Sequence, residues 1–359
     1  MRIVEEKPRN VSEVSRWSRS GRCGLAFDWS AAAWVWLHLV RRNLVPDNSR
    51  TRTAIHGRIT MAVSAAAPTG PMSHIIGTGS IPLLTALACS VDGSLQNLLR
   101  KSLDWWICAC AKSTESDLSL GAAGAIMACG EIEAYMPGSV PRSFVRQLHG
   151  RCLTAFKSNL KPSGSKPICL GLSHGLAGYL LALEVSKSLF DLPLDHALRE
   201  RGLNAIMSER FQSGRWSAWP MFSGADHLNA NSWCHGAPGI GLAFLCAHIH
   251  SGWRGYKDAA TSAIEGAFRV GQNSSSLSFC CGKVGIAQTL IEAYRWTRDT
   301  LQLERARKMV PAMMKNRTTF NRLYRQAGHH KGGLGFDYLL WRLKYPDQLP
   351  LLGLCWPAR

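Results

Sequence analysis

One motif recurs along the chain and limits what it can fold into. From about residue 72 onward, a Gly-x-x-Gly turn is followed each time by a run of apolar residues. The clear copies start at Gly121, Gly175, Gly236, Gly282 and Gly332, and 77–80 (Gly-Thr-Gly-Ser) is a weaker earlier copy. Consecutive first glycines lie 44 to 61 residues apart, a length that suits two helices and their loops. The spacing therefore predicts an array of helical hairpins.

The segments between the turns favour an all-α fold. Residues 98–111, 141–158, 195–211 and 255–270 are compatible with helices, and strand-like alternation is scarce. Glycine turns allow close backbone approach and leave amides exposed where a helix begins. If the array closes on itself, the turns gather at one end of a ring. The alternative is an open helical solenoid in which the glycines only break helices, and periodicity alone does not separate the two.

Three cysteines stand directly before two of the glycine turns. Cys234 precedes His235-Gly236, and the vicinal pair Cys280-Cys281 precedes Gly282. Zinc is held by thiolates and imidazoles, and a catalytic zinc site has three protein ligands and one open position. Because the three thiols share a repeat context, the sequence predicts a metal site made of Cys234, Cys280 and Cys281. We interpret the other cysteines in apolar segments as buried, inert thiols.

Two histidines and an acid occur at related places in the repeat. His174 stands just before its Gly-x-x-Gly turn, much as Cys234 does in the next copy, and its pKa range suits proton transfer near neutrality. Asp117 lies four residues before Gly121, where it is either a helix cap or, in a ring, a neighbour of His174. His235 is a hydrogen-bond donor behind the metal ligands or a second proton-transfer group, and spacing does not rank these roles.

Composition excludes several classes of protein. The 359 residues include 46% hydrophobic and 18% charged residues, which supports a folded core. The net charge of +18 fits nucleic acid, a membrane surface or an acidic peptide as partner, but no nucleic-acid-binding motif accompanies it. Residues 31–40 are the most apolar early run and are far shorter than the ~20 residues of a membrane span. Without a secretion signal, we expect the 12 cysteines to be reduced and the protein to be cytoplasmic.

The first part of the chain differs from the rest. Residues 1–66 are rich in arginine and show one short periodic segment, 29–44, so we expect a poorly defined basic region with one helix. Residues 67–359 are expected to form the repeat domain.

The motifs together resemble a known family. The strings 233–240 (Trp-Cys-His-Gly-Ala-Pro-Gly-Ile), 173–178 (Ser-His-Gly-Leu-Ala-Gly) and 280–282 (Cys-Cys-Gly) resemble the lanthionine synthetase C-like family. The likeness is greater to the C-terminal cyclase domain of the class II bifunctional lanthipeptide synthetases. Residues 332–343 and 345–350 are similar to the closing repeat of those enzymes. The resemblance covers roughly residues 72–353.

The resemblance implies a double-layered α/α toroid with one zinc ion at one end of its cavity. Members of the family cyclise dehydrated precursor peptides in lanthipeptide biosynthesis. A peptide cysteine adds through sulfur to dehydroalanine or dehydrobutyrine and gives a lanthionine or methyllanthionine thioether. The partners implied are a dehydrated precursor peptide and a separate dehydratase, because this chain has no room for a dehydratase domain.

The family's functional residues map onto this sequence with one departure. Cys234 and Cys280 match the first two zinc ligands, and Cys281 stands where most members have histidine, which implies a three-thiolate zinc. His174 matches the proton-transfer histidine and Asp117 the aspartate before the second glycine turn. Four thiolates around one ion, counting the substrate's, would leave the substrate sulfur more nucleophilic.

Three alternatives remain open. The protein could add a small thiol such as glutathione to dehydroamino acids. It could be a toroid that binds metal and peptide without turnover, because the repeat at 77–80 lacks its second glycine and no seventh repeat is visible in residues 1–66. The zinc could also be structural and closed by His235 or a distant histidine, in which case no exchangeable position is left.

Overall fold

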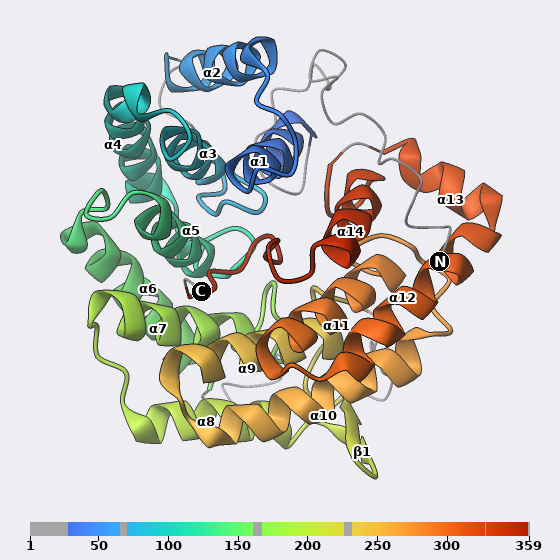
Figure 1. The fold of residues 1–359 in the computed structure, drawn as a ribbon. Helices are drawn as coiled ribbons and strands as arrows, with labels where there is room; N and C mark the ends of the chain where they lie inside the picture. The colour runs from blue at the N-terminus through green and yellow to red at the C-terminus, as the bar shows by residue number, and fades with distance from the viewer. Residues whose placement is uncertain (1–27, 65–69, 161–166, 226–231, 327, 358–359) are drawn as a thin grey trace.

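The computed structural model describes residues 28–64, 70–160, 167–225, 232–326 and 328–357, and these are mostly helical (Figure 1). The inner helices are α1 (Asp28–Arg41), α3 (Ser80–Cys89), α5 (Ala122–Tyr135), α7 (Leu176–Phe190), α9 (Ala237–Ser251), α11 (Lys283–Thr297) and α14 (Leu334–Lys344). The outer helices are α2 (Ser49–Ser64), α4 (Gln96–Lys112), α6 (Arg142–Asn159), α8 (His196–Met207), α10 (Arg254–Gly271), α12 (Thr300–Lys315) and α13 (Arg317–Tyr324). The 3₁₀ turn η3 (Gly93–Leu95) precedes α4.

The inner helices form a closed ring. Each contacts the next in the order given above, and α14 returns to contact α1 (Figure 1). The open solenoid is therefore excluded, and the predicted double-layered α/α toroid is confirmed.

Burial explains why the two layers have different sequences. An inner helix has neighbours on both sides and an outer helix behind it, so α9 is buried at every residue from Ala237 to Ala247. An outer helix buries one stripe only: in α10, Tyr256, Ala259, Ala263 and Ala267 face inward at a spacing of three or four.

Glycine is required where several inner helices begin, because the preceding turn folds back against the helix. A Cβ atom on Gly239 would lie 1.8 Å from the carbonyl oxygen of Trp233, and one on Gly285 would lie 2.0 Å from that of Phe279. Any side chain there would force the turn off the helix. The second glycine of the motif is thus a packing requirement of the turn.

Backbone hydrogen bonds join the turns around the ring. The N–H of Ser119 donates to the carbonyl of Ser173 (3.0 Å), and that of Ser173 to Cys234 (2.9 Å). The N–H of Cys234 donates to Cys280 (3.4 Å), and that of Cys280 to His330 (2.9 Å). These residues each lie two positions before the first glycine of their repeat. The turns are therefore fixed relative to one another at one end of the toroid.

The C-terminal residues fill the centre of the ring. After α14 the chain runs inward (Figure 1), and residues 349, 351, 352 and 354–356 are buried. The N–H of Leu351 donates to Glu292 of α11 (3.1 Å), and the carbonyl of Cys355 accepts from His250 of α9 (2.9 Å). Both partners lie in the later turns of their helices, so these two contacts lie toward the end of the ring opposite the glycine turns.

The N-terminal region departs from the expectation of one helix and eroded repeats. The structure has two helices there, and α1, whose residues 29–40 are all buried, takes the seventh position of the inner ring. Trp34 of α1 packs against Tyr338 of α14 at 6.4 Å between ring centroids. The seventh repeat was missed although Gly21-Arg-Cys-Gly24, followed by Leu-Ala-Phe, stands directly before α1 in the sequence. Residues 1–27 lie outside the described residues. We propose that the domain includes α1 and α2, rather than starting at residue 67.

One predicted helix ends early. The segment 195–211 is helical only to Met207, and Phe211–Ser213 (β1) pairs antiparallel with Trp216–Ala218 (β2). Gly214, with φ of +59°, makes the turn between the two strands.

Candidate metal centre

The turns at one end of the ring bring chemically active side chains together by position in the repeat. The residue before each first glycine is His174, His235, Cys281 or Lys331 in four successive copies. Cys234 and Cys280 lie one residue earlier in their copies. The counterpart of His174 is therefore His235 and not Cys234, because the structure aligns the copies through their hydrogen-bonded backbones.

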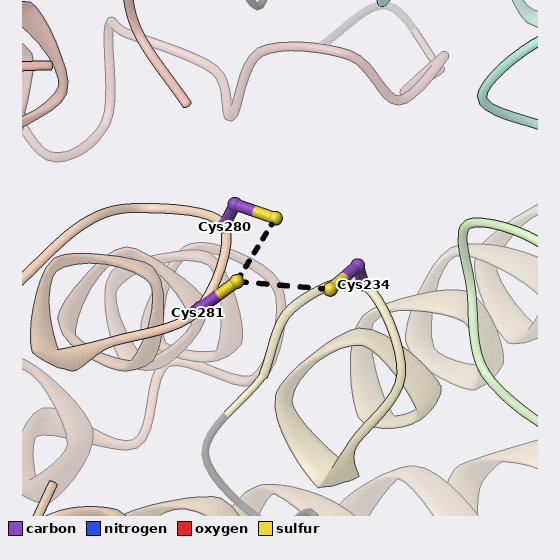
Figure 2. A group of neighbouring side chains, drawn as sticks. All are labelled: Cys234, Cys280 and Cys281. Atoms are coloured by element: carbon purple, nitrogen blue, oxygen red, sulfur yellow. Dashed lines mark hydrogen bonds between the residues drawn. The ribbon is translucent and has the colours of Figure 1, made fainter. Parts of the chain in front are cut away.

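The three predicted thiols converge. Figure 2 shows Cys234, on the turn before α9, facing Cys280 and Cys281 on the turn before α11. The Sγ atom of Cys281 lies 4.0 Å from that of Cys234 and 3.4 Å from that of Cys280. All three sulfur atoms lie within 4.8 Å of one another. Sulfur ligands of a tetrahedral zinc, with Zn–S bonds of about 2.3 Å, stand about 3.8 Å apart. The donor set and its spacing therefore fit zinc.

The thiols influence one another's ionisation. Hydrogen bonding with Cys234 and Cys280, together with the nearby Lys331, lowers the pKa of Cys281. Hydrogen bonding with Cys234 and Cys281 raises the pKa of Cys280, and burial adds to the effect. For Cys234, the bond with Cys280 lowers the pKa, but the bond with Cys281 and burial bring it to about 11. Cys281 thus loses its proton readily, whereas Cys234 and Cys280 hold theirs. A divalent cation bound here would favour the thiolate form of all three.

Two further side chains contact the sulfur atoms. The Ser232 hydroxyl lies 2.6 Å from the Sγ of Cys234, and the Lys331 ammonium donates to the Sγ of Cys281 at 2.9 Å. Burial lowers the pKa of Lys331, but the hydrogen bond to Cys281 and the charges of Cys280, Cys281 and Cys234 together outweigh burial and raise the pKa. Sequence reasoning missed Lys331. The available signal was its place directly before Gly332, which matches that of Cys281 in the preceding copy.

His174 and Asp117 form a hydrogen-bonded pair on neighbouring turns. The Nδ1 of His174 lies 2.9 Å from Oδ2 of Asp117, and the other carboxylate oxygen accepts the backbone N–H of Leu120 at 2.6 Å. Asp117 is held by its own turn and shielded, with 13% of its side chain exposed, whereas 37% of the His174 side chain is exposed. Asp117 thus favours the tautomer that carries hydrogen on Nδ1 and leaves Nε2 available to a substrate.

His235 lies between this pair and the thiols. Its ring stacks on that of His174 at 5.6 Å between centroids, and its Nδ1 lies 3.7 Å from the Sγ of Cys169. Burial and the neighbouring His174 lower the pKa of His235. Among the described residues, no fourth His, Cys, Asp or Glu joins the thiol group, so no protein ligand closes the site there. This disfavours a structural zinc closed by His235.

Comparison with known proteins decides the family. The family model described as "Lanthionine synthetase C-like protein" matches residues 38–355. The chain belongs to the lanthionine synthetase C-like family. The match begins inside α1, ahead of the domain start expected at residue 67, and it includes every predicted site residue.

Two known proteins are similar to this chain. The fold is similar to that of nisin cyclase, with a TM-score of 0.69 and 16% identity, covering 99% of this chain and 95% of that one. A curated relative, "Glutathione S-transferase LANCL1" of Danio rerio, is 27% identical over 137 residues, which are 38% of this chain. The matched part spans about a third of that relative. Within the described residues, no helix is long and apolar enough to cross a bilayer.

Proposed function

We propose that the protein is a zinc-dependent enzyme that forms thioethers in peptides by adding cysteine thiols to dehydroalanine or dehydrobutyrine. The observation that carries the proposal is one juxtaposition. Three sulfur atoms within 4.8 Å of one another share an end of the ring with the hydrogen-bonded pair His174 and Asp117. Family membership and the toroid shared with nisin cyclase support the cyclase class.

Cys234, Cys280 and Cys281 would hold the metal. Bound zinc supplies a charge that keeps a substrate thiol deprotonated and hence nucleophilic. Because the described residues offer three ligands and no fourth, the remaining position is available to a substrate sulfur. The departure from the common histidine makes the site wholly sulfur-ligated, which is compatible with zinc.

His174 would transfer the proton that the thiol loses to the product. Addition forms a carbon–sulfur bond, breaks the carbon–carbon π bond and leaves a carbanion beside the carbonyl, which must receive the proton that the thiol lost. With Nδ1 bound to Asp117, the Nε2 of His174 can accept a proton and return it to the α-carbon. Asp117 orients the ring. His235, stacked on His174, is a second candidate for this transfer.

The surroundings suit a peptide substrate. A cavity of about 450 Å³ lies between Cys281 and helix α13 and is lined by Ser276, Ser278, Arg322 and Lys331. Hydroxyl groups and cations in this cavity can bind backbone carbonyls and acidic side chains, and the net charge of +18 favours an acidic leader segment. The dehydroamino acids of such a substrate would be supplied by a dehydration reaction that precedes the addition.

A second candidate function is the addition of glutathione to dehydroamino acids. The specific observation in its favour is the similarity over 137 residues to a relative named as a glutathione S-transferase. The proposed centre serves both reactions, since both need a thiolate nucleophile and a proton donor. They differ in whether the thiol comes from the same peptide.

One assay separates these possibilities. Purified protein is analysed for zinc and then mixed with a dehydrated peptide that contains one cysteine, with and without glutathione. Free thiols are followed by alkylation and mass spectrometry. We expect about one zinc per chain and loss of the peptide thiol without a change in peptide mass. Mass gain by glutathione would favour the second function, and zinc without any thiol loss would favour a non-catalytic binding protein. In the same assay Cys108→Ala, which removes an exposed cysteine outside the proposed metal site, should behave like wild type.

A further inference from the structure

Lys331 is placed by the ring and not by its neighbours in sequence. It lies on the turn before α14, yet its Nζ donates to the Sγ of Cys281 on the preceding turn at 2.9 Å. The two turns are joined by the hydrogen bond from the N–H of Cys280 to the carbonyl of His330 (2.9 Å). The His330 ring also packs at 4.9 Å from Phe279. The lysine is therefore brought to the sulfur atom by a rigid backbone connection.

The contact between Lys331 and Cys281 bears on the net charge of the proposed metal centre. Two thiolates and a neutral histidine around Zn²⁺ sum to zero, whereas three thiolates leave a net charge of −1. A substrate thiolate makes that charge −2. An ammonium group at hydrogen-bond distance from one sulfur returns the resting centre to neutrality and withdraws electron density from that sulfur. The cation contacts Cys281, the ligand that introduces the extra negative charge.

We propose that Lys331 is a positioning residue that stabilises the three-thiolate metal centre by offsetting the charge of Cys281 and fixing its sulfur. The proposal rests on the proposed metal site and goes beyond it, because it assigns a role outside the ligands and the proton-transfer pair. It also makes Cys281 and Lys331 an interdependent pair. The lysine matters only where the third ligand is a thiolate.

The chain offers a matched control in the same cavity. Arg322 of α13 lines this cavity with Lys331 and Cys281, carries the same charge and is exposed. Among the described residues, no hydrogen bond joins it to a sulfur atom of the site. A general effect of positive charge near the metal would affect both residues, but a specific contact with Cys281 affects only Lys331.

The test measures zinc affinity by competition with a chelator, independently of any activity. We expect Lys331→Met to weaken zinc binding by about 10- to 100-fold, the usual loss when a residue that supports a ligand is removed. Lys331→Arg should restore most of the affinity, and Arg322→Met should leave it unchanged. Because Lys331 and Arg322 are both exposed, the metal-free forms of all three variants should keep the unfolding midpoint of metal-free wild type in urea.

Repeating the measurement in a Cys281→His protein tests whether the effect of Lys331 depends on the charge of the third ligand. In Cys281→His the third ligand is neutral, so adding Lys331→Met should cost little or nothing. An equal loss in both backgrounds, or no loss in either, would overturn the role of Lys331. Wild-type protein that binds no zinc would overturn both this role and the proposed function. Zinc binding with the predicted coupling but no thiol addition would overturn the proposed function alone.

Discussion

The same helices form both ends of the toroid, but the polar groups at the two ends differ in burial and in the number of hydrogen bonds they make. At the turn end, the polar atoms of Cys281, Lys331 and His174 are partly accessible and few bonds hold them. At the opposite end, where the C-terminal segment enters, Glu292 is fully buried and every carboxylate oxygen is bonded. It accepts from Trp296 (2.9 Å) and Leu351 (3.1 Å), and it pairs with two arginines.

We infer that the turn end serves binding and reaction and that the opposite end stabilises the fold, although the same repeats form both ends. Groups that must bind a ligand cannot be consumed by internal bonds, whereas a buried charge without partners would be costly. We therefore expect substitutions at the turn end to change metal binding and activity with little effect on folding. Substitutions at the opposite end should do the reverse.

The largest effect is expected from removing a sulfur ligand. Cys281→Ala should abolish stoichiometric zinc and thiol addition, because two thiolates form an incomplete site. The unfolding midpoint of the metal-free protein should stay close to that of wild type. Metal analysis with urea unfolding of the metal-free form checks both. Stoichiometric zinc in this variant, with Cys108→Ala unchanged, would show that the metal site lies elsewhere.

The next effect concerns proton transfer. His174→Ala should slow thiol addition by about 10²- to 10⁴-fold, the usual contribution of a positioned acid–base group, while zinc stays bound. Single-turnover disappearance of the peptide thiol, at saturating zinc, measures it. A rate within a few-fold of wild type would transfer the role to His235, which stacks on the same ring.

A comparable free-energy change is expected at the opposite end, in stability alone. Glu292→Ala leaves Arg342 buried without its carboxylate partner and should lower the free energy of unfolding by about 3–5 kcal/mol. Glu304→Ala, on the exposed face of α12, is the control and should change stability by less than about 0.5 kcal/mol. Denaturant unfolding gives both values. Zinc bound per folded chain should match wild type, and a loss of metal would contradict the division between the two ends.

Sequence reasoning succeeded where local chemistry repeats and failed where closure of the ring decides. The glycine turns predicted the helix starts, because a Cβ at Gly239 or Gly285 cannot be accommodated. The same turns predicted that Cys234, Cys280 and Cys281 would meet, and the structure brings their sulfur atoms together. Their binding of zinc stays a prediction.

The failures have two causes. Helix α1, which completes the ring through contacts with α3 and α14, had a signal in the sequence, because Gly21-Arg-Cys-Gly24 precedes it. The other failures concern contacts between segments that are distant in sequence. The contact between Lys331 and Cys281 joins residues on different turns, so only the aligned backbones reveal it. The burial of residues 349, 351, 352 and 354–356 likewise depends on the hollow that the closed ring creates.

The smallest expected effect concerns the pH dependence of stability. It comes from Glu131, a buried carboxyl group that, unlike Glu292, has no ionic partner among the described residues. Glu131, in a late turn of α5, is 7% exposed, and burial raises its pKa to about 8. His74, 3.9 Å away, has its pKa lowered by burial to about 4, so the two are neutral near pH 7 and form no ion pair.

The sign of the pH dependence follows from proton uptake. Between the unfolded value of 4.5 and about 8, folded Glu131 keeps a proton that the unfolded chain releases. Its contribution to stability is complete below pH 4.5 and is lost as pH rises through about 8, by about 1.4 kcal/mol per pH unit. His74 acts oppositely, but only below its ordinary value of 6.5. From pH 6.5 to 8, Glu131→Gln should therefore gain about 2 kcal/mol relative to wild type in urea unfolding. A constant difference across this range would mean that Glu131 is ionised and paired with His74, as the other charges of this end are.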